Sequence, residues 1–324
     1  MGVKDNIFEA LRKELPGVKR NVLLKYHTTF KIGGPANYFF IAKERELLLK
    51  GIRLAKQYKL PVFVMGGGSN LLVSDKGFSG LVIKIQFTKW DLAQDDIIVS
   101  EAGVMMKDLV SASVKQGLAG LEWAGGLPGT LGGAIRGNAG AFGGEIKDSV
   151  VEVLALDNKL TLKKLSNKQC KFSYRSSIFK EKNWMVLFAK LQGKKGDKKN
   201  LAAIASSHIN YRKEKHPLEY PNAGSVFKNV DVKKLSPKVQ MLFLDKVKKD
   251  PFPIVPSAWL IIGAGLTGKK IGRAQISQKH SNYIVNLGGA TAKEVLALID
   301  FAKKTIKKKY GVVLEQEIQY LNNN

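Results

Sequence analysis

Apolar and polar positions alternate along the chain with periods that change from strand-like to helix-like. After a short first helix, residues 21–42 alternate around Gly33-Gly34-Pro35, which predicts strands on both sides of this turn. Residues 44–58 place apolar side chains at helical spacing, and the apolar run 61–65 predicts a strand that enters a glycine loop. A further strand is predicted at 81–85, so the first part of the chain alternates strands with a single helix.

The middle of the chain continues this mixture but contains a segment dense in glycine, residues 120–145. Each glycine inside a helix costs about 0.5–1 kcal/mol relative to alanine, so no amphipathic helix is expected there. We expect a loop-rich segment whose backbone approaches another group closely. Around it, the pattern predicts strands at 97–104, 150–157, 160–166 and 184–191, and helices at 106–118 and 201–217.

The last third of the chain is predicted to form a further mixed domain. Thr291 and Glu294 form a capping box in front of the strongest helix of the sequence, residues 295–310. Strands are predicted at 224–230, 283–289 and 311–321, with a proline-broken loop at 251–256 and a short helix or strand at 258–261.

Composition is that of a soluble globular protein: 44% of the 324 residues are hydrophobic and 25% are charged. No apolar segment has the length of a signal peptide or a membrane span, so we expect a cytoplasmic protein without membrane contact. The single cysteine, Cys170, excludes an internal disulfide, and the four scattered histidines have no ligand spacing, so no metal site is expected.

The chain is strongly basic, with 53 Lys and Arg against 27 Asp and Glu and a net charge of +26. Only eight of the basic residues are arginine. Arginine is favoured for specific recognition of bases and phosphates, so an excess of lysine indicates general attraction of anions. No specific nucleic-acid partner is expected, although nonspecific contact with polyanions is an alternative.

Residues 261–272, IIGAGLTGKKIG, fit one nucleotide-binding pattern and nearly fit another. Gly263, Gly265 and Gly268 have the spacing of a dinucleotide turn, and Gly268-Lys269 approaches a phosphate loop but is followed by Lys270 instead of Ser or Thr. No helix pattern opens after Gly268, and a dinucleotide turn requires one. We therefore expect these glycines to form turns.

Two other glycine stretches are better suited to a phosphate group. In residues 66–71, three consecutive glycines precede the Ser69 hydroxyl and the Asn70 amide, and no Cβ atom blocks the backbone N–H groups. Residues 125–140 repeat this chemistry over a longer span, with Thr130 and Asn138 as polar donors. Together they predict a large, extended, phosphorylated ligand.

The order of several motifs resembles the UDP-N-acetylenolpyruvoylglucosamine reductase family. The motifs include VMGGGSNLL, GLPGTLGGAIRGNAG, YRSS, NAGSVFKN, KHSNYIVN and LEQEI, and the resemblance extends from about residue 22 to residue 320. It implies an α+β fold with an FAD-binding region of two subdomains, like those of vanillyl-alcohol-oxidase-type (PCMH) flavoproteins, and a C-terminal α+β substrate domain. The implied boundaries are 1–85, to which the C-terminal strand returns, 86–212 and 213–324.

The resemblance also implies the chemistry. NADPH reduces FAD, which passes hydride to the enolpyruvyl group of UDP-N-acetylglucosamine enolpyruvate and yields UDP-N-acetylmuramate for peptidoglycan synthesis. FAD is expected to be noncovalent, because covalent flavoproteins of this fold carry a histidine in or beside the first glycine loop and GGGSN has none. A monomer is expected. The implied FAD-binding residues are Gly66, Gly67, Gly68, Ser69, Asn70, Leu71, Gly125, Pro128, Gly129, Thr130, Gly132, Gly133, Gly137, Asn138 and Gly140.

The implied catalytic residues are Arg175, Ser225 and Glu317. Hydride addition leaves an enolate-like intermediate, which a cation such as Arg175, helped by Glu317, would stabilise. Ser225 is the implied proton donor to the neighbouring carbon. Glu315 is an alternative to Glu317, since alternation places both on one face of the predicted strand.

Substrate contacts implied by the resemblance are made by Tyr174, Arg212, Lys228, Asn229 and His280. Whether Thr267 or Lys269 also contacts the UDP-sugar stays open. Packing, not chemistry, is expected for Cys170.

Overall fold

The computed structural model describes residues 3–322, which form two compact units. Unit 1 comprises residues 1–22, 36–67 and 79–211, and unit 2 comprises 23–35, 68–78 and 212–324. The chain therefore passes into unit 2 and back twice before residue 211. The second passage begins inside the predicted glycine loop, between Gly67 and Gly68. Both units mix helices with largely antiparallel sheets, which confirms the predicted α+β class.

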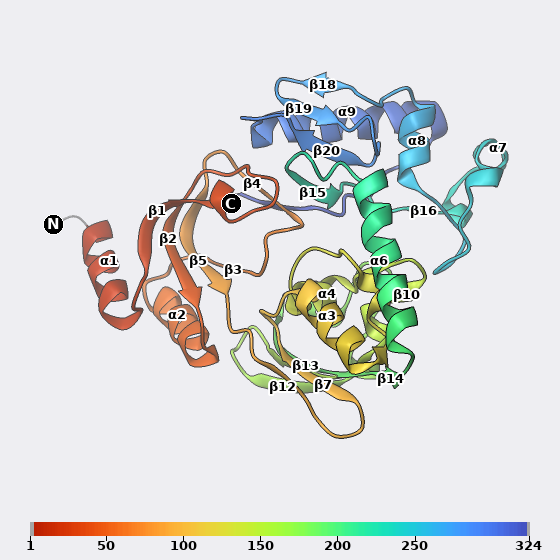
Figure 1. Ribbon diagram of the computed structural model, residues 1–324. Helices are drawn as coiled ribbons and strands as arrows, with labels where there is room; N and C mark the ends of the chain where they lie inside the picture. The colour runs from red at the N-terminus through yellow and green to blue at the C-terminus, as the bar shows by residue number, and fades with distance from the viewer. Residues whose placement is uncertain (1–2, 323–324) are drawn as a thin grey trace. The chain divides into compact units, whose positions relative to one another are not determined.

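Unit 1 contains a four-stranded sheet beside two N-terminal helices (Figure 1). Its strand order is β1-β2-β5-β3, with β3 parallel to β5, and the apolar faces of the helices contribute Leu11, Leu48 and Ile52 to the core. The predicted helix at 44–58 and strand at 61–65 are confirmed. The elements are α1 (Val3–Glu14), β1 (Lys19–Leu23), β2 (Pro35–Ala42), α2 (Arg45–Gln57), β3 (Val62–Met65) and β5 (Phe78–Ile85).

The rest of unit 1 is built on a five-stranded antiparallel sheet of order β12-β11-β13-β7-β6. The predicted hairpin is confirmed, with Val153 opposite Leu165. The strands are β6 (Trp90–Leu92), β7 (Ile97–Glu101), β11 (Val150–Leu156), β12 (Leu162–Ser166) and β13 (Met185–Gln192), and two short pairs add β8 (Leu118–Ala119) with β14 (Lys194–Lys195) and β9 (Gly140–Ala141) with β10 (Gly144–Glu145). The helices are α3 (Met106–Gln116), α4 (Leu131–Gly137), α5 (Ile178–Glu181) and α6 (Lys198–Lys215).

Two predictions for this region need correction. The glycine-dense segment is not only loop, because α4 begins at Leu131, where the Thr130 hydroxyl accepts the Gly133 N–H (3.4 Å). Its buried Leu131, Ala134 and Ile135 compensate for the low helix propensity of glycine. Helix α6 also begins earlier than predicted, at Lys198, because the Asp197 carboxylate accepts the Asn200 N–H (2.8 Å).

Unit 2 packs α8 (Ser257–Gly263) and α9 (Ala292–Tyr310) with a four-stranded antiparallel sheet of order β15-β20-β19-β18. The predicted capping box of α9 is confirmed: the Thr291 hydroxyl accepts the Glu294 N–H (3.2 Å), and the Glu294 carboxylate accepts the Thr291 N–H (3.0 Å). The remaining elements are β4 (Leu71–Val73), β15 (Asn222–Ser225), β16 (Val230–Asp231), α7 (Pro237–Leu242), β17 (Ile254–Val255), β18 (Lys270–Ile271), β19 (Ala274–Ile276), β20 (Tyr283–Asn286) and β21 (Gln319–Leu321).

Three strands of unit 2 are shorter than predicted, and one of them, β20, ends at Asn286 instead of residue 289. The predicted strand at 224–230 is observed as β15, Asn222–Ser225, and its register with β20 shifts between Asn222 and Ser225, around Gly224 (φ +79°). The predicted strand at 311–321 is extended, but only Gln319–Leu321 forms β21, parallel to β4. Before that, the segment is held by a single bridge between Phe227 and Gln316.

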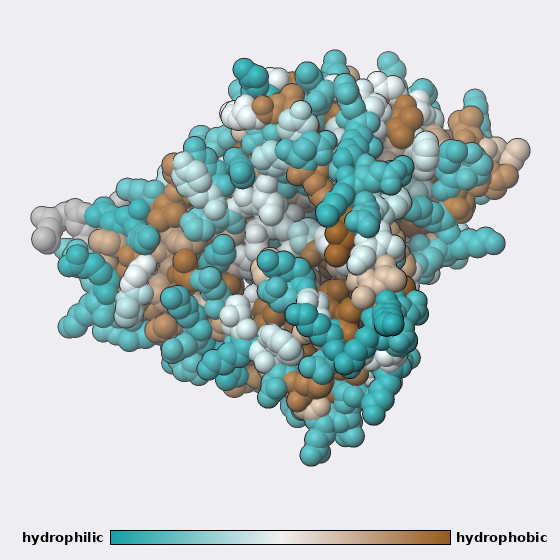
Figure 2. Space-filling view, in the orientation of Figure 1, coloured by the Kyte–Doolittle hydropathy of each residue, from teal (hydrophilic) through white to brown (hydrophobic). Residues whose placement is uncertain are grey.

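Hydrophilic side chains cover most of the face in Figure 2, in keeping with the lysine-rich composition. Among the residues that the structure describes, no helix is long and apolar enough to cross a membrane.

Candidate active site

The two predicted glycine stretches touch each other within unit 1. A Cβ atom on Gly66 would lie 2.5 Å from the Thr130 Oγ1 atom, and one on Gly67 would lie 3.1 Å from the Gly129 Cα atom. Neither glycine has a positive φ angle, so close approach, not backbone conformation, requires them. Two segments about sixty residues apart thus pack closely, with the Thr130 hydroxyl beside the glycine backbone, and such a glycine-lined surface fits the pyrophosphate of a dinucleotide.

The second stretch is packed tightly on its inner side and open on its outer side. A Cβ atom on Gly125 would lie 2.4 Å from the Ala205 carbonyl oxygen, and one on Gly132 would lie 2.9 Å from the Ala102 Cβ atom. A Cβ atom on Gly133 would meet only Thr130 Oγ1, at an ordinary 3.6 Å, and one on Gly137 would meet nothing within 4 Å.

Asn138 connects this stretch to the hairpin that carries the predicted catalytic arginine. It is fully buried in the left-handed conformation that ends α4 (φ +42°). Its side-chain amide donates to the Ser173 carbonyl (3.0 Å), and its Oδ1 atom accepts the Lys147 N–H (3.3 Å). Asn138 is therefore needed for packing, whatever else it contacts.

Arg175 occupies the tip of a tight turn. Ser173 and Ser176 exchange backbone hydrogen bonds (3.0 and 3.1 Å), and Arg175 between them has a φ angle of +56°, which is costly for a residue with a side chain. Its guanidinium donates to the Gly140 carbonyl (2.9 Å) and lies over the Tyr174 ring (5.1 Å). The fold thus brings Arg175 and Tyr174 to the second glycine stretch.

The end of the first glycine loop lies in unit 2 and contacts the segment of Glu317. The Asn70 side-chain amide donates to the Glu317 carbonyl (3.2 Å), and the Asn70 carbonyl accepts the Gln319 N–H (3.0 Å). Gly68 accepts the Thr29 N–H (3.2 Å), and Leu71 begins β4. Ser69 is partly buried between them.

Ser225 and Glu317 belong to neighbouring segments of unit 2. Ser225 ends β15 opposite Tyr283, and the Glu317 N–H donates to the carbonyl of Val226 (2.8 Å). Both side chains are partly buried. Burial is the largest cause that raises the pKa of the Tyr283 phenol; Arg212 and Ser225 lower this pKa, and the Glu317 charge raises it.

The two acidic candidates differ in their surroundings. Glu315 is exposed and forms an ion pair with Lys228, whose N–H also donates to the Glu315 carbonyl (2.9 Å). Asn229 is engaged through its Oδ1 atom, which accepts the Ser257 N–H (3.2 Å). Lys228 and Asn229 therefore lie beside the Glu317 segment.

His216 and Tyr283, which were not among the predicted site residues, lie beside two of them, Arg212 and His280. The Tyr283 hydroxyl lies 3.1 Å from the His216 Nδ1 atom, and the His280 ring packs edge-on against both side chains (5.4 and 4.8 Å between ring centroids). The predicted Arg212 is buried, and its charge lowers the pKa of both His216 and Tyr283. His280 and Tyr283 share the motif KHSNYIVN, but His216 lies in no motif, and the cluster assembles only because α6, β20 and the segments next to them come together.

Electrostatics keep these groups uncharged near neutral pH. Burial first, and then the charges of His280, Arg212 and Lys279, lower the pKa of His216 to about 4. Burial also lowers the pKa of His280, with Lys248 acting in the same direction.

Gly265 and Gly268 form turns, as predicted, but the prediction is wrong for Gly263, which is the last residue of helix α8. Helix α8 ends at Gly263, and Gly265 (φ +72°) and Gly268 (φ +78°) reverse the chain before β18. The Thr267 hydroxyl lies 2.8 Å from the Ser281 hydroxyl, and the Lys269 ammonium lies over the Phe301 ring (5.2 Å).

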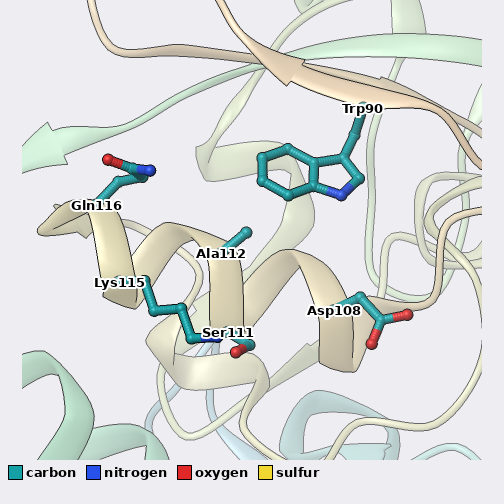
Figure 3. A pocket seen from close by; sticks show the side chains of 6 residues that line it. All are labelled: Trp90, Asp108, Ser111, Ala112, Lys115 and Gln116. Carbon is teal, nitrogen blue, oxygen red and sulfur yellow. The ribbon is translucent and has the colours of Figure 1, made fainter.

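Other features give no competing site. A pocket of about 280 Å³ is lined by Trp90 and one face of α3 (Figure 3), and Asp108 is the one carboxylate among its lining residues, so it has no pair of acidic groups. Burial raises the pKa of Cys170 to about 12, so this thiol is unreactive. Within residues 3–322, no group of three His, Cys, Asp or Glu side chains could hold a metal ion.

Comparison with known proteins agrees with both glycine stretches and with the C-terminal region. Residues 36–166 match the family model "FAD binding domain", and residues 216–321 match "UDP-N-acetylenolpyruvoylglucosamine reductase, C-terminal domain". Proteins named UDP-N-acetylenolpyruvoylglucosamine reductase are 40% identical in Caldanaerobacter subterraneus subsp. tengcongensis, over 92% of each chain, and 40% identical in Anoxybacillus flavithermus, over 96% of each chain. The crystal structure of a protein of this name from Thermus caldophilus matches with a TM-score of 0.74 at 30% identity, over 94% of this chain and 99% of that one.

Proposed function

The chain belongs to the UDP-N-acetylenolpyruvoylglucosamine reductase family, and we propose that it catalyses the reduction for which this family is named. The substrate is UDP-N-acetylglucosamine enolpyruvate, the electron donor is NADPH, and the product, UDP-N-acetylmuramate, enters peptidoglycan precursor synthesis. The observation that carries this proposal is the continuity of the first glycine loop, which contacts the second glycine stretch at Gly66–Gly67 and bonds to the Glu317 segment at Asn70.

FAD supplies the hydride chemistry when it is bound. The residues that would hold its pyrophosphate are the glycines of the two stretches, where the Cβ positions of Gly133 and Gly137 have open space beside the protein. Ser69, Asn70 and Thr130 would add polar contacts. The binding is noncovalent, because neither stretch contains a histidine or cysteine that could be attached to a flavin.

Arg175 stabilises the negative charge that develops on the substrate after hydride addition. Its guanidinium is fixed by Gly140 and its backbone by the left-handed turn, so little reorganisation is needed as the charge appears. The strain at Arg175 is typical of residues held for function. Glu317 assists, and Glu315 does not, because the Glu315 carboxylate is exposed and paired with Lys228.

Ser225 donates the proton that completes the reduction. A serine hydroxyl is a weak acid, so the groups around it must lower the energy of the alkoxide that proton transfer creates. Arg212, Lys228, Asn229 and His280, together with Tyr174 in unit 1, bind the UDP-sugar. Buried Arg212 is suited to an anionic group, because guanidinium remains charged even though burial lowers its pKa.

The protein acts in the cytoplasm, where NADPH and nucleotide sugars are found, as a monomer and without a specific nucleic-acid partner. The low share of arginine among its 53 basic residues supports the last point.

Substitution of Ser225 tests the proposal. In Ser225→Ala, NADPH should reduce the bound FAD at nearly the normal rate, whereas reoxidation by the enolpyruvyl substrate should slow at least about 100-fold, the lower end for general acid catalysis. Stopped-flow absorbance measures the two half-reactions separately. Ser236→Ala is the matched control, since this exposed hydroxyl caps no backbone N–H, and it should leave both rates unchanged. Equal losses in both half-reactions of Ser225→Ala would contradict the role.

A further inference from the structure

Tyr283 connects the proposed proton donor to a histidine at the surface of unit 2. Its hydroxyl lies 3.1 Å from His216 Nδ1, and Tyr283 is the direct cross-strand partner of Ser225 in the pairing of β20 with β15. Tyr283 is buried, with 7% of its surface exposed, whereas His216 is only partly buried and reaches solvent. Three groups that each carry a transferable proton thus lie in a row from the site of protonation to water.

The charges around the row keep both relaying groups neutral. Arg212, His280 and Lys279 lower the pKa of His216, and burial lowers it further, so the imidazole is uncharged at pH 7 and has one donor and one acceptor nitrogen. Burial keeps the Tyr283 phenol protonated, with Glu317 acting in the same direction and Arg212 and Ser225 opposing it. A neutral phenol between a hydroxyl and a neutral imidazole can accept one proton while it gives up another.

We propose that Tyr283 and His216 form a proton relay that resupplies Ser225 during the reduction. This inference rests on the proposed function of Ser225. As the Ser225 proton forms the new C–H bond, the Tyr283 proton passes to Ser225 Oγ and the His216 Nδ1 proton passes to the Tyr283 oxygen. The other nitrogen of His216 takes a proton from water. All three side chains are neutral before and after the transfer, and one solvent proton is consumed for each substrate molecule.

The relay would prevent negative charge from accumulating on Ser225 after it donates its proton. A serine that gives up its proton in a partly buried site would leave an alkoxide, and an unpaired charge there is costly. With the relay, the negative charge never rests on Ser225, because each transfer is matched by the next. Tyr283 and His216 touch neither the substrate nor the cofactor in this role, so they are positioning residues that act through Ser225.

The experiment uses the FAD-loaded protein and separates the two half-reactions. Tyr283→Phe removes the transferable proton and keeps the ring, and His216→Gln replaces the imidazole by a neutral polar side chain. NADPH reduction of the flavin should stay within about twofold of wild type in both variants, while reoxidation by substrate slows by about 10- to 100-fold, less than in Ser225→Ala. Tyr310→Phe, which removes a phenol hydroxyl beside Phe243, is the control and should change neither rate.

Solvent isotope effects distinguish a relay from a structural role. In mixtures of light and heavy water, the reoxidation rate of wild type should depend on deuterium content along a curve, because several protons move together. Tyr283→Phe should give a straight line, because only the Ser225 proton moves. A loss of rate without this change of shape would indicate damage to the site and would overturn the relay.

The possible failures separate the relay from the proposed function. If Ser225→Ala reoxidises slowly and Tyr283→Phe and His216→Gln keep the wild-type rate and the curved dependence, the relay is wrong and Ser225 remains the donor. If Ser225→Ala itself reoxidises at the normal rate, the role of Ser225 fails and the relay fails with it. If Tyr283→Phe does not retain FAD, the comparison of His216→Gln with wild type decides by the same criteria.

Discussion

Adjacent glycines on α4 should respond in opposite ways to the same substitution. Gly132 faces Ala102, where an added Cβ atom would lie 2.9 Å from the Ala102 Cβ atom and 3.2 Å from its carbonyl oxygen. Gly133 is exposed, and its Cβ atom would meet only Thr130 Oγ1 at 3.6 Å. Both residues lie inside the helix without a positive φ angle, so alanine is conformationally acceptable at each.

The expected magnitudes follow from these contacts. In the flavin-free protein, Gly133→Ala should raise the free energy of unfolding by about 0.5–1 kcal/mol, the difference in helix propensity. Gly132→Ala has the same gain but overpacks the contact with Ala102, which costs about 1–3 kcal/mol, so the second variant should be less stable than the first by that amount. If the cofactor covers the exposed side of α4, the Gly133→Ala methyl group should weaken FAD binding at least about tenfold, or about 1.4 kcal/mol.

Urea unfolding of the apoprotein and titration with FAD, followed by flavin fluorescence, measure the two quantities independently. Gly133→Ala is expected to have a higher free energy of unfolding than wild type and a lower affinity for FAD. FAD affinity in Gly133→Ala within twofold of wild type would show that the cofactor does not approach this face of α4. Equal stability of the two variants would show that the contact with Ala102 relaxes without cost, and the tight packing inferred for the second stretch would then be wrong.

Three further outcomes are expected. Thr291→Ala removes the capping box of α9 and should lower the free energy of unfolding by about 1–2 kcal/mol, and an unchanged urea midpoint would contradict it. The pKa of His216 is about 4 in the folded protein against 6.5 for an ordinary histidine, so between these values the unfolded chain binds a proton that the folded protein does not. The free energy of unfolding should therefore fall as pH drops from about 6.5 to 4, and it should fall less steeply in His216→Gln. Cys170 should react with thiol reagents only after unfolding, because burial raises its pKa to about 12; rapid labelling of the native protein would refute this.

Local patterns were sufficient for much of the fold. The helices α2, α3 and α9 and the hairpin of β11 and β12 follow from apolar spacing and caps, because each is determined by residues close in sequence. The errors occur where tertiary contacts decide. Helix α4 forms in spite of its glycines because three apolar side chains are buried, and the extended segment before β21 pairs with Phe227 only through an isolated bridge at Gln316.

The residues of the candidate site also fall into two groups, those that the sequence identified and those that only the tertiary structure brings together. Glycine stretches, YRSS and NAGS are contiguous motifs, so their residues were identified from the sequence and remain predictions until the variants are measured. His216 lies in no motif, and Tyr283, although it belongs to KHSNYIVN, is a tyrosine in an apolar strand that the pattern alone did not single out. Only the pairing of β15 with β20 and the path of the chain after α6 bring the two side chains together beside Ser225.

The spacing of glycines in the sequence does not identify a nucleotide-binding site in this chain, whereas their φ angles and Cβ contacts distinguish turns from close approaches. Gly265 and Gly268 have positive φ angles and form turns, although they belong to the one segment that fits a nucleotide-binding pattern. Gly66 and Gly132 have ordinary φ angles, and only the lack of a Cβ atom lets another segment approach. Gly133 requires neither explanation within the protein, since its φ angle is ordinary and its Cβ position is open. A glycine that neither the backbone conformation nor the packing requires indicates that a group outside the chain comes close. For this reason we expect an added methyl group to weaken FAD binding at Gly133 and not in residues 261–272.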